Sequence, residues 1–214
     1  MLSAKYVSVF GGDSTKKAFK KAHTEYLNFL EMNADFSGGQ EEIAEYEYLK
    51  NNPKKAIKAY ETALAFDDYN NNAPLNLAYL YYQQNDIKRA ARLYDKVIKQ
   101  EPDNSYPYYM LGLLFNELGK DKASLNYLKQ ASEREPFNFR AYYNYALKLQ
   151  QKQQFSESIK VIEKALKKLP NNSELLYVKL IGLMKLNKVN EAEKVCSQLI
   201  TLNPGNQNFQ QILV

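Results

Sequence analysis

The chain has 214 residues, of which 45% are hydrophobic and 25% charged, and its formal net charge is +5. This composition is typical of one globular domain and excludes wholesale disorder. The single cysteine excludes an internal disulfide, a CxxC metal site and a CxxCH haem attachment, and no apolar run approaches the roughly 20 residues of a membrane span.

The N-terminal segment predicts one helix. Residues 1–12 have no assignable role, and the start lacks the apolar core of a signal peptide. Asp13-Ser14-Thr15 is typical of an N-cap, and a helix is expected from there to about Met32. Its apolar residues form one stripe, while Lys17 and Lys21 belong to a solvated side. Residues 1–36 are therefore expected to be an extension and a capping helix for the helices that follow.

A fixed period organises the rest of the chain. Pro102, Pro136, Pro170 and Pro204 follow one another at a constant step, from i to i+34, which is the signature of a repeat architecture. Asp68 stands where a first proline would be, so the register of the first repeat depends on other positions. With proline as position 32, five repeats are predicted at 37–70, 71–104, 105–138, 139–172 and 173–206.

Small residues recur at fixed positions within these repeats, where two helices must approach closely. Position 8 is Ala44, Ala78, Gly112 and Ala146, with Leu180 as the exception in the last repeat, and position 20 is Ala56, Ala90, Ser124, Ser158 and Ala192. Polar turns separate the two helices of each repeat, and proline followed by Asn or Ser separates one repeat from the next. Residues 207–214 are expected to start a C-terminal capping helix.

Helix–turn–helix units of this period, with small residues at positions 8 and 20, a large residue at 24 and proline at 32, resemble tetratricopeptide repeats (TPRs). The resemblance covers roughly residues 37–206. It implies an all-α fold, a right-handed α-α superhelical solenoid of five TPR units with capping helices at both ends. It also implies a protein-interaction module, although members of such families serve many different partners.

The resemblance implies that positions 2, 5, 6, 9, 12 and 13 of each repeat line a concave groove. Leu75, Met110, Leu113, Leu147, Ile181 and Met184 are the apolar groups expected there. Tyrosine and amide side chains can hold a peptide backbone by ring contact and hydrogen bonds. The alternative is that the tyrosines pack between adjacent repeats. The predicted peptide-binding residues are Tyr48, Asn76, Tyr79, Tyr82, Tyr106, Tyr109, Asn116, Arg140, Tyr143, Asn144 and Tyr177.

The charges at these positions argue against nucleic acid in the groove. The five carboxylates are Glu41, Glu42, Glu45, Glu117 and Glu174, and the two cations are Arg140 and Lys185. Phosphate contacts need clustered cations, whereas the excess lysines belong to the second helices. Glu41 and Glu45 occupy positions where relatives that grip a C-terminal carboxylate carry basic or amide groups, so such a clamp is not expected.

The sequence carries no constellation typical of an enzyme. The only histidine, His23, falls in the expected capping helix, and Cys196 falls at core position 24 of the last repeat. Glu41, Glu42 and Glu45 are at helical spacing and are expected to be a solvated face. We therefore expect neither metal nor cofactor, and no catalysis.

The functional prediction is a non-catalytic TPR scaffold or adaptor that binds a peptide or partner protein. One alternative is a repeat module of a larger bacterial protein, because the run from Glu25 to Asp35 resembles segments attached to multihaem cytochromes c. Another is a homo-oligomer formed through the solenoid ends, so the chain is expected to be a monomer or a weak homo-oligomer. The expected compartment is the cytoplasm or the periplasm, without a choice between them.

Overall fold

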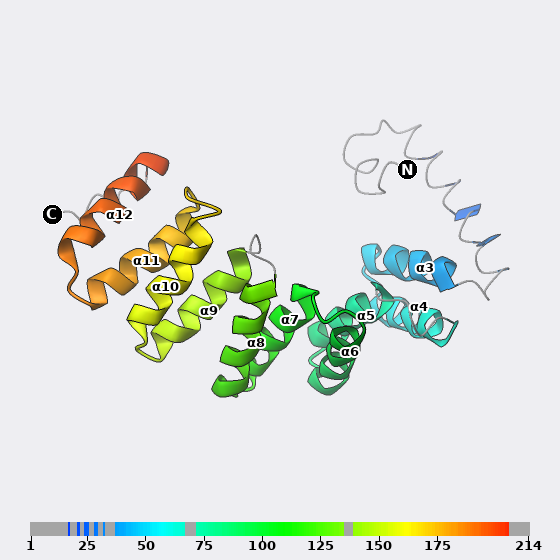
Figure 1. Ribbon diagram of the computed structural model, residues 1–214. Coiled ribbons are helices and arrows are strands. Elements are labelled where there is room, and N and C mark those ends of the chain that lie inside the picture. Colours follow the sequence, from blue (N-terminus) through cyan, green and yellow to red (C-terminus); the bar gives the residue numbers. More distant parts are fainter. Residues whose placement is uncertain are drawn as a thin grey trace. The chain divides into compact units, whose positions relative to one another are not determined.

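The computed structural model describes residues 37–66, 72–134 and 139–205, together with seven residues between Lys17 and Met32. The three ranges contain ten α-helices and no strand (Figure 1). The helices are α3 (Ser37–Leu49), α4 (Pro53–Phe66), α5 (Asn72–Gln83), α6 (Ile87–Gln100), α7 (Ser105–Glu117), α8 (Asp121–Arg134), α9 (Phe139–Gln151), α10 (Phe155–Leu166), α11 (Ser173–Lys185) and α12 (Val189–Leu202).

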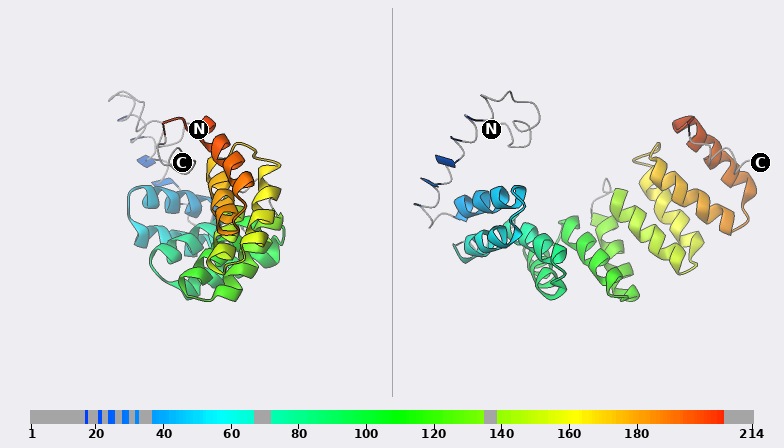
Figure 2. Two further views of the ribbon diagram at one scale, coloured as in Figure 1. Left: turned by 90° about the vertical axis from the view of Figure 1, so that its left-hand side faces the viewer. Right: turned by 180° about the vertical axis from the view of Figure 1, so that it is seen from behind.

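The chain divides into two compact units, Met1–Leu93 and Tyr94–Val214, called unit 1 and unit 2 below. In unit 1, α3 packs against α4, and α4 packs against α5. In unit 2, the consecutive helices from α7 to α12 pack pairwise, and α9 also contacts α11 directly. Figure 2 shows the same back-and-forth course of the helices within each unit. The predicted all-α helical repeat fold is thus confirmed, while the repeat boundaries and terminal caps stay predictions.

The turn inside each hairpin is built in the same way. Asn51, Asn85, Gly119, Gln153 and Asn187 recur with the period of the prolines, and all have positive φ angles between 54° and 66°. One residue later, the backbone N–H donates to a carbonyl five residues back, as from Lys120 to Phe115 at 2.9 Å. This is the Schellman arrangement, in which a left-handed residue ends the helix. Each first helix therefore stops at an equivalent place.

The predicted small positions lie where paired helices come closest. All the residues at positions 8 and 20 are buried. A Cβ added at Gly112 of α7 would lie 2.7 Å from the side chain of Leu128 in α8 and 3.2 Å from its backbone nitrogen. Only a residue without a side chain allows this approach, so the predicted close packing of the two helices is confirmed.

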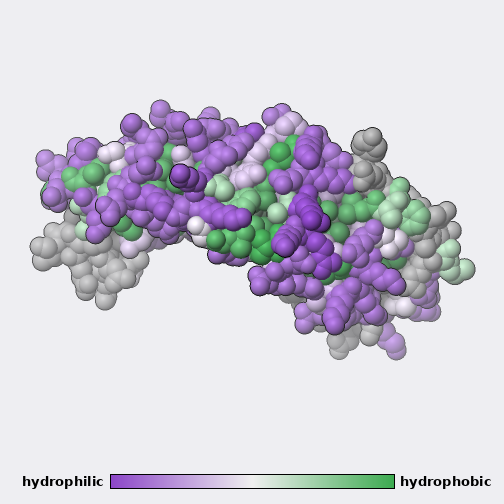
Figure 3. Space-filling model, turned by 90° about the horizontal axis from the view of Figure 1, so that it is seen from below, coloured by the Kyte–Doolittle hydropathy of each residue, from purple (hydrophilic) through white to green (hydrophobic). Residues whose placement is uncertain are grey.

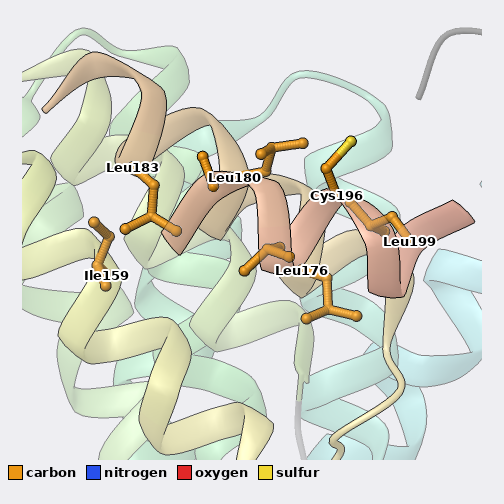
Figure 4. Packing of buried hydrophobic residues seen from close by; sticks show 8 residues of the cluster. Ile159, Leu176, Leu180, Leu183, Cys196 and Leu199 are labelled. Atoms are coloured by element: carbon orange, nitrogen blue, oxygen red, sulfur yellow. The ribbon is translucent and has the colours of Figure 1, made fainter. Parts of the chain in front are cut away.

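The core of unit 2 continues into its last hairpin. Leu176, Leu180 and Leu183 of α11 face Cys196 and Leu199 of α12, and Ile159 of α10 joins them (Figure 4). Cys196 is fully buried, and burial raises the pKa of its thiol. The sequence prediction that Cys196 is a core residue is therefore confirmed.

Polar side chains cap the helices that begin after the repeat turns. Asn104 Oδ1 accepts a hydrogen bond from the Tyr106 amide at 3.1 Å at the start of α7. Asn172 Oδ1 accepts from the Leu175 amide at 3.0 Å at the start of α11. Both interactions satisfy amide groups that have no partner within a helix.

The two expected capping helices lie mostly outside the described residues. The N-terminal residues that are described are helical and exposed, and they include Lys17 and Lys21, which were predicted to be solvated. His23, the loop around Asp68 and residues 206–214 are outside the described part.

Candidate peptide-binding face

The predicted groove residues come from the first helix of each hairpin. In unit 1 these are α3 and α5, and in unit 2 they are α7, α9 and α11. The side chains at the predicted groove positions of these helices are called the first-helix face of each unit below. Because each first helix ends at an equivalent left-handed residue, equal repeat positions lie on equivalent sides of these helices.

The first-helix face of unit 1 joins tyrosine, amide and carboxylate groups. Tyr48 at the end of α3 is 40% exposed, and its hydroxyl accepts a hydrogen bond from Gln83 Nε2 of α5 at 3.4 Å. Asn76 is exposed, and its amide lies near the hydroxyl of the buried Tyr60. Burial raises the pKa of Tyr60, and the nearby Glu45 carboxylate adds to this rise. Tyr79 and Tyr82 are half-buried.

The first-helix face of unit 2 has its polar centre between α7 and α9. Asn144 Nδ2 donates to the Tyr109 hydroxyl at 3.4 Å and to the Arg140 carbonyl at 2.9 Å. Burial raises the pKa of Tyr109, and the guanidinium of Arg140 opposes this rise. Arg140 itself is exposed, and its guanidinium forms no ion pair with any described residue. The face therefore presents a cation beside a phenol and an amide.

The other tyrosines of this face are only partly covered. Tyr106 is 38% exposed and makes an edge-on contact with Tyr94, with ring centroids 6.4 Å apart. Tyr177 is 44% exposed. Tyr143 is half-buried and packs against the hydrophobic core between α9 and α10. The two alternatives for the tyrosines thus both occur, because the same ring can pack on one side and remain open on the other.

Two residues expected in the groove, Met110 and Asn116, have a structural role, and so does Gln150 at the position equivalent to Asn116 in the next repeat. Met110 is only 5% exposed and belongs to the core, so the prediction that it lines the groove is wrong; its side of α7 faces the interior. Asn116 Oδ1 accepts a hydrogen bond from Lys148 Nζ at 2.6 Å, although the residue is exposed. Gln150 Nε2 donates to the Val178 carbonyl at 2.8 Å and links α9 to α11.

The buried lysine is the residue that sequence reasoning missed. Lys148 is 7% exposed and forms an ion pair with Asp121 of α8 at 2.6 Å, and Lys152 binds the other oxygen of the same carboxylate. The repeat pattern carries no signal for it, since the other repeats place different residue types there. A second feature missed is a hollow of about 360 Å³ on unit 1, lined by Gln40, Ile43, Glu47, Lys55, Lys58, Ala59 and Thr62.

Charged side chains are exposed both at the groove positions and on the second helices. Of the groove-position carboxylates, Glu42, Glu45, Glu117 and Glu174 are exposed. Lysines of the second helices, such as Lys58, Lys160 and Lys164, are also exposed. One face of the molecule, drawn in Figure 3, is mostly hydrophilic with hydrophobic side chains gathered in smaller areas.

Two negative observations concern the described residues. They contain no group of three or more His, Cys, Asp or Glu side chains that could hold a metal ion. None of their helices combines the length and the hydropathy required of a bilayer span.

Comparisons with known proteins agree with the fold. Two family models described as tetratricopeptide repeat match residues 48–114 and 109–173. No curated protein matches the chain.

Solved structures with low sequence identity share the architecture. PilF from Pseudomonas aeruginosa has a TM-score of 0.71 at 18% identity, covering 98% of this chain and 95% of its own. YrrB, described as a TPR protein with an unusual peptide-binding site, has a TM-score of 0.67 at 18% identity over 87% of this chain and 96% of its own. MamA has a TM-score of 0.68 at 19% identity, with 78% and 92% coverage. The repeat period, the helical hairpins and both family matches together show that the chain belongs to the tetratricopeptide repeat family.

Proposed function

We propose that the chain is a non-catalytic scaffold that binds a peptide or a partner protein through its first-helix faces. The observation that carries this proposal is the combination, on unit 2, of partly exposed tyrosine rings with a guanidinium that forms no ion pair with a described residue. Tyr106 and Tyr177 are more than one third exposed, and Arg140 has no ion-pair partner among the described residues. Exposed aromatic and arginine side chains are the groups that most often dominate binding energy.

The physical chemistry of these groups suits a guest chain. A tyrosine ring offers a large contact area with little loss of conformational entropy, and its hydroxyl can donate or accept a hydrogen bond. Amide groups such as Asn76 and Gln151 are exposed and can bond to a peptide backbone without requiring a charge. YrrB, which shares the fold, is described as having a peptide-binding site, and this supports a peptide as the guest here.

A displayed library of random peptides, selected on the intact chain, tests this function. Peptides that bind the first-helix faces are expected to lose about tenfold or more in affinity for a Tyr143→Ala/Tyr177→Ala variant. The same double substitution at Lys164 and Lys167, which are exposed on and just after α10, is the matched control and should change nothing. Circular dichroism of each variant checks that the helices persist.

Two outcomes would contradict the proposal. Selection of no peptide would contradict a peptide as the guest, and selection of peptides insensitive to the tyrosine substitutions would place the binding surface elsewhere. Light scattering on the same samples separates a homo-oligomer from a monomer that binds foreign peptides.

A further inference from the structure

The first-helix face of unit 2 is arranged in rows. Helices α7, α9 and α11 begin at equivalent repeat positions, Ser105, Phe139 and Ser173. Residues i and i+34 therefore take equivalent places on the first helices of successive hairpins. One row is Tyr109, Tyr143 and Tyr177, and the neighbouring row is Tyr106, Arg140 and Glu174.

These rows run across helices that lie side by side. The Asn144–Tyr109 hydrogen bond joins α9 to α7, and α9 contacts α11 directly. Packed helices are about 8–10 Å apart between their axes. A guest that lies across α9 and α11, which contact each other directly, therefore meets Tyr143 and Tyr177 about 8–10 Å apart.

This interval selects among guest conformations. A polyproline II chain has three residues per turn and rises about 3.1 Å per residue, so one of its sides recurs every 9.3 Å or so. In an extended strand the same side recurs at roughly 6.6 Å and 13 Å, which misses the interval. An α-helix presents the same face again after seven residues, or about 10.5 Å. This distance is close to the upper end of the roughly 8–10 Å interval between the tyrosines.

The hydrogen-bonding groups of the face favour polyproline II over a helix. A polyproline II backbone has no internal hydrogen bonds, so its carbonyl groups need donors. The Asn116 amide nitrogen donates to no described residue, and Gln151 at the end of α9 is exposed. An α-helical guest has already satisfied its own backbone. Grooves lined by aromatic side chains also bind proline-rich segments.

The row that contains Arg140 and Glu174 would fix how a guest chain is aligned along the face. Arg140 and Glu174 hold the same position on adjacent helices, both are exposed, and neither side chain forms an ion pair with a described residue. A complementary guest carries an acidic side chain opposite Arg140 and a basic one opposite Glu174. Along a polyproline II chain, these two side chains are three residues apart.

We propose that the first-helix face of unit 2 binds a proline-rich polyproline II segment that carries an acidic and a basic residue three positions apart. The tyrosine row contacts the prolines, Arg140 pairs with the acidic residue, and Glu174 pairs with the basic one. This inference rests on the proposed peptide-binding function and names its guest.

Fluorescence anisotropy with the intact chain and labelled synthetic peptides tests the proposal. The first probes are short proline peptides with one aspartate and one lysine, placed either three residues apart, in both orders, or four residues apart. The other probe is an alanine-based helical peptide in which the two charged residues are seven residues apart. One of the peptides with the three-residue spacing is expected to bind about two- to fivefold more tightly than the others, which is the range of exposed charge pairs.

Substitutions in the chain give the sharper test. Arg140→Glu should weaken the preferred peptide about two- to fivefold. The double reversal Arg140→Glu/Glu174→Arg should transfer the preference to the peptide with the opposite charge order. Tyr177→Ala should weaken all proline peptides about tenfold. Lys164→Glu changes a charge on α10, outside the face, and should leave all affinities unaltered.

The outcomes separate this inference from the broader function. Tighter binding of the helical peptide, with the same sensitivity to Tyr177→Ala, would overturn the polyproline II guest and leave peptide binding intact. Proline peptides that ignore both the spacing and the double reversal would overturn the charge register. Failure of every probe to bind would overturn the inference, while the peptides selected from the random library would still decide whether the face binds peptides.

Discussion

The Nζ atom of Lys148 in α9 lies 2.6 Å from Oδ1 of Asp121 in α8, so one ion pair joins two consecutive hairpins. Lys148 also donates to Asn116 Oδ1 at 2.6 Å, and Lys152 binds the second carboxylate oxygen of Asp121. The lysine is only 7% exposed and depends on these partners because water cannot replace them fully. These interactions link the end of α7 and the start of α8 to α9 in the next hairpin.

Asp121→Asn is expected to lower the stability of unit 2, because it leaves the buried ammonium of Lys148 with neutral acceptors and no counter-charge from Asp121. Adding Lys148→Met should recover part of the loss, since a methionine needs no counter-charge at that site. Urea unfolding followed by circular dichroism measures both effects. Lys152→Ala, at an exposed partner of the same carboxylate, should change stability least. Equal unfolding midpoints for the wild type and Asp121→Asn would contradict the proposed fastening role.

Protonation of Asp121 should contribute to the loss of folding stability at low pH. Hydrogen bonds from Lys148 and Lys152 lower the pKa of Asp121 to about 2, from an ordinary value of 3.8. A lowered folded-state pKa means that the unfolded chain binds the proton first as the pH falls. Its stabilising contribution is therefore complete above about pH 4 and is lost towards pH 2.

The difference between the wild type and Asp121→Asn isolates this contribution. Asp86 and Glu191 also have lowered pKa values, because of hydrogen bonds from Arg89 and Lys188, and their effects cancel in the difference. The stability difference should shrink as the pH falls from about 4 to about 2. A difference that stays constant over this range would show that the carboxylate is not held by the two lysines.

Gly112→Ala should destabilise unit 2 although alanine favours a helix. The new Cβ would lie 2.7 Å from Leu128, whose side chain is 2% exposed and has little room to move. Overpacking costs about 1–3 kcal/mol, and the higher helix propensity of alanine offsets roughly 1 kcal/mol. Thermal unfolding measures the net loss. Gly205→Ala is the matched control and should be nearly neutral, because no described atom other than those of its chain neighbours lies within 4 Å of the new Cβ.

Gln153→Gly should stabilise the chain. Gln153 has a φ angle of 60° at the same turn position where Gly119 has 66°. A left-handed conformation costs a residue with a side chain roughly 1 kcal/mol, which glycine avoids. The urea midpoint should therefore rise for Gln153→Gly and fall for Gly119→Ala. Gln154→Gly changes a neighbour with a negative φ, and a comparable rise there would disprove the conformational explanation.

Much of the architecture could be read from the amino-acid sequence because its signals are local and repeated. The four evenly spaced prolines, the small residues at positions 8 and 20, and the asparagines of the turns each act within one hairpin. The same residue types recur at these positions in most repeats, so agreement between repeats compensates for exceptions such as Leu180. Helical periodicity also placed Cys196 in the core.

The tertiary structure alone decided which groove positions are open. Met110 and Asn144 share position 6 of their repeats, yet Met110 is buried and Asn144 bonds to Tyr109. Lys148 is buried only because Asp121 and Asn116 of the preceding hairpin lie within reach of its ammonium. A repeat pattern specifies how a hairpin closes on itself, whereas exposure and pairing depend on side chains that a neighbouring hairpin brings from a distant part of the sequence.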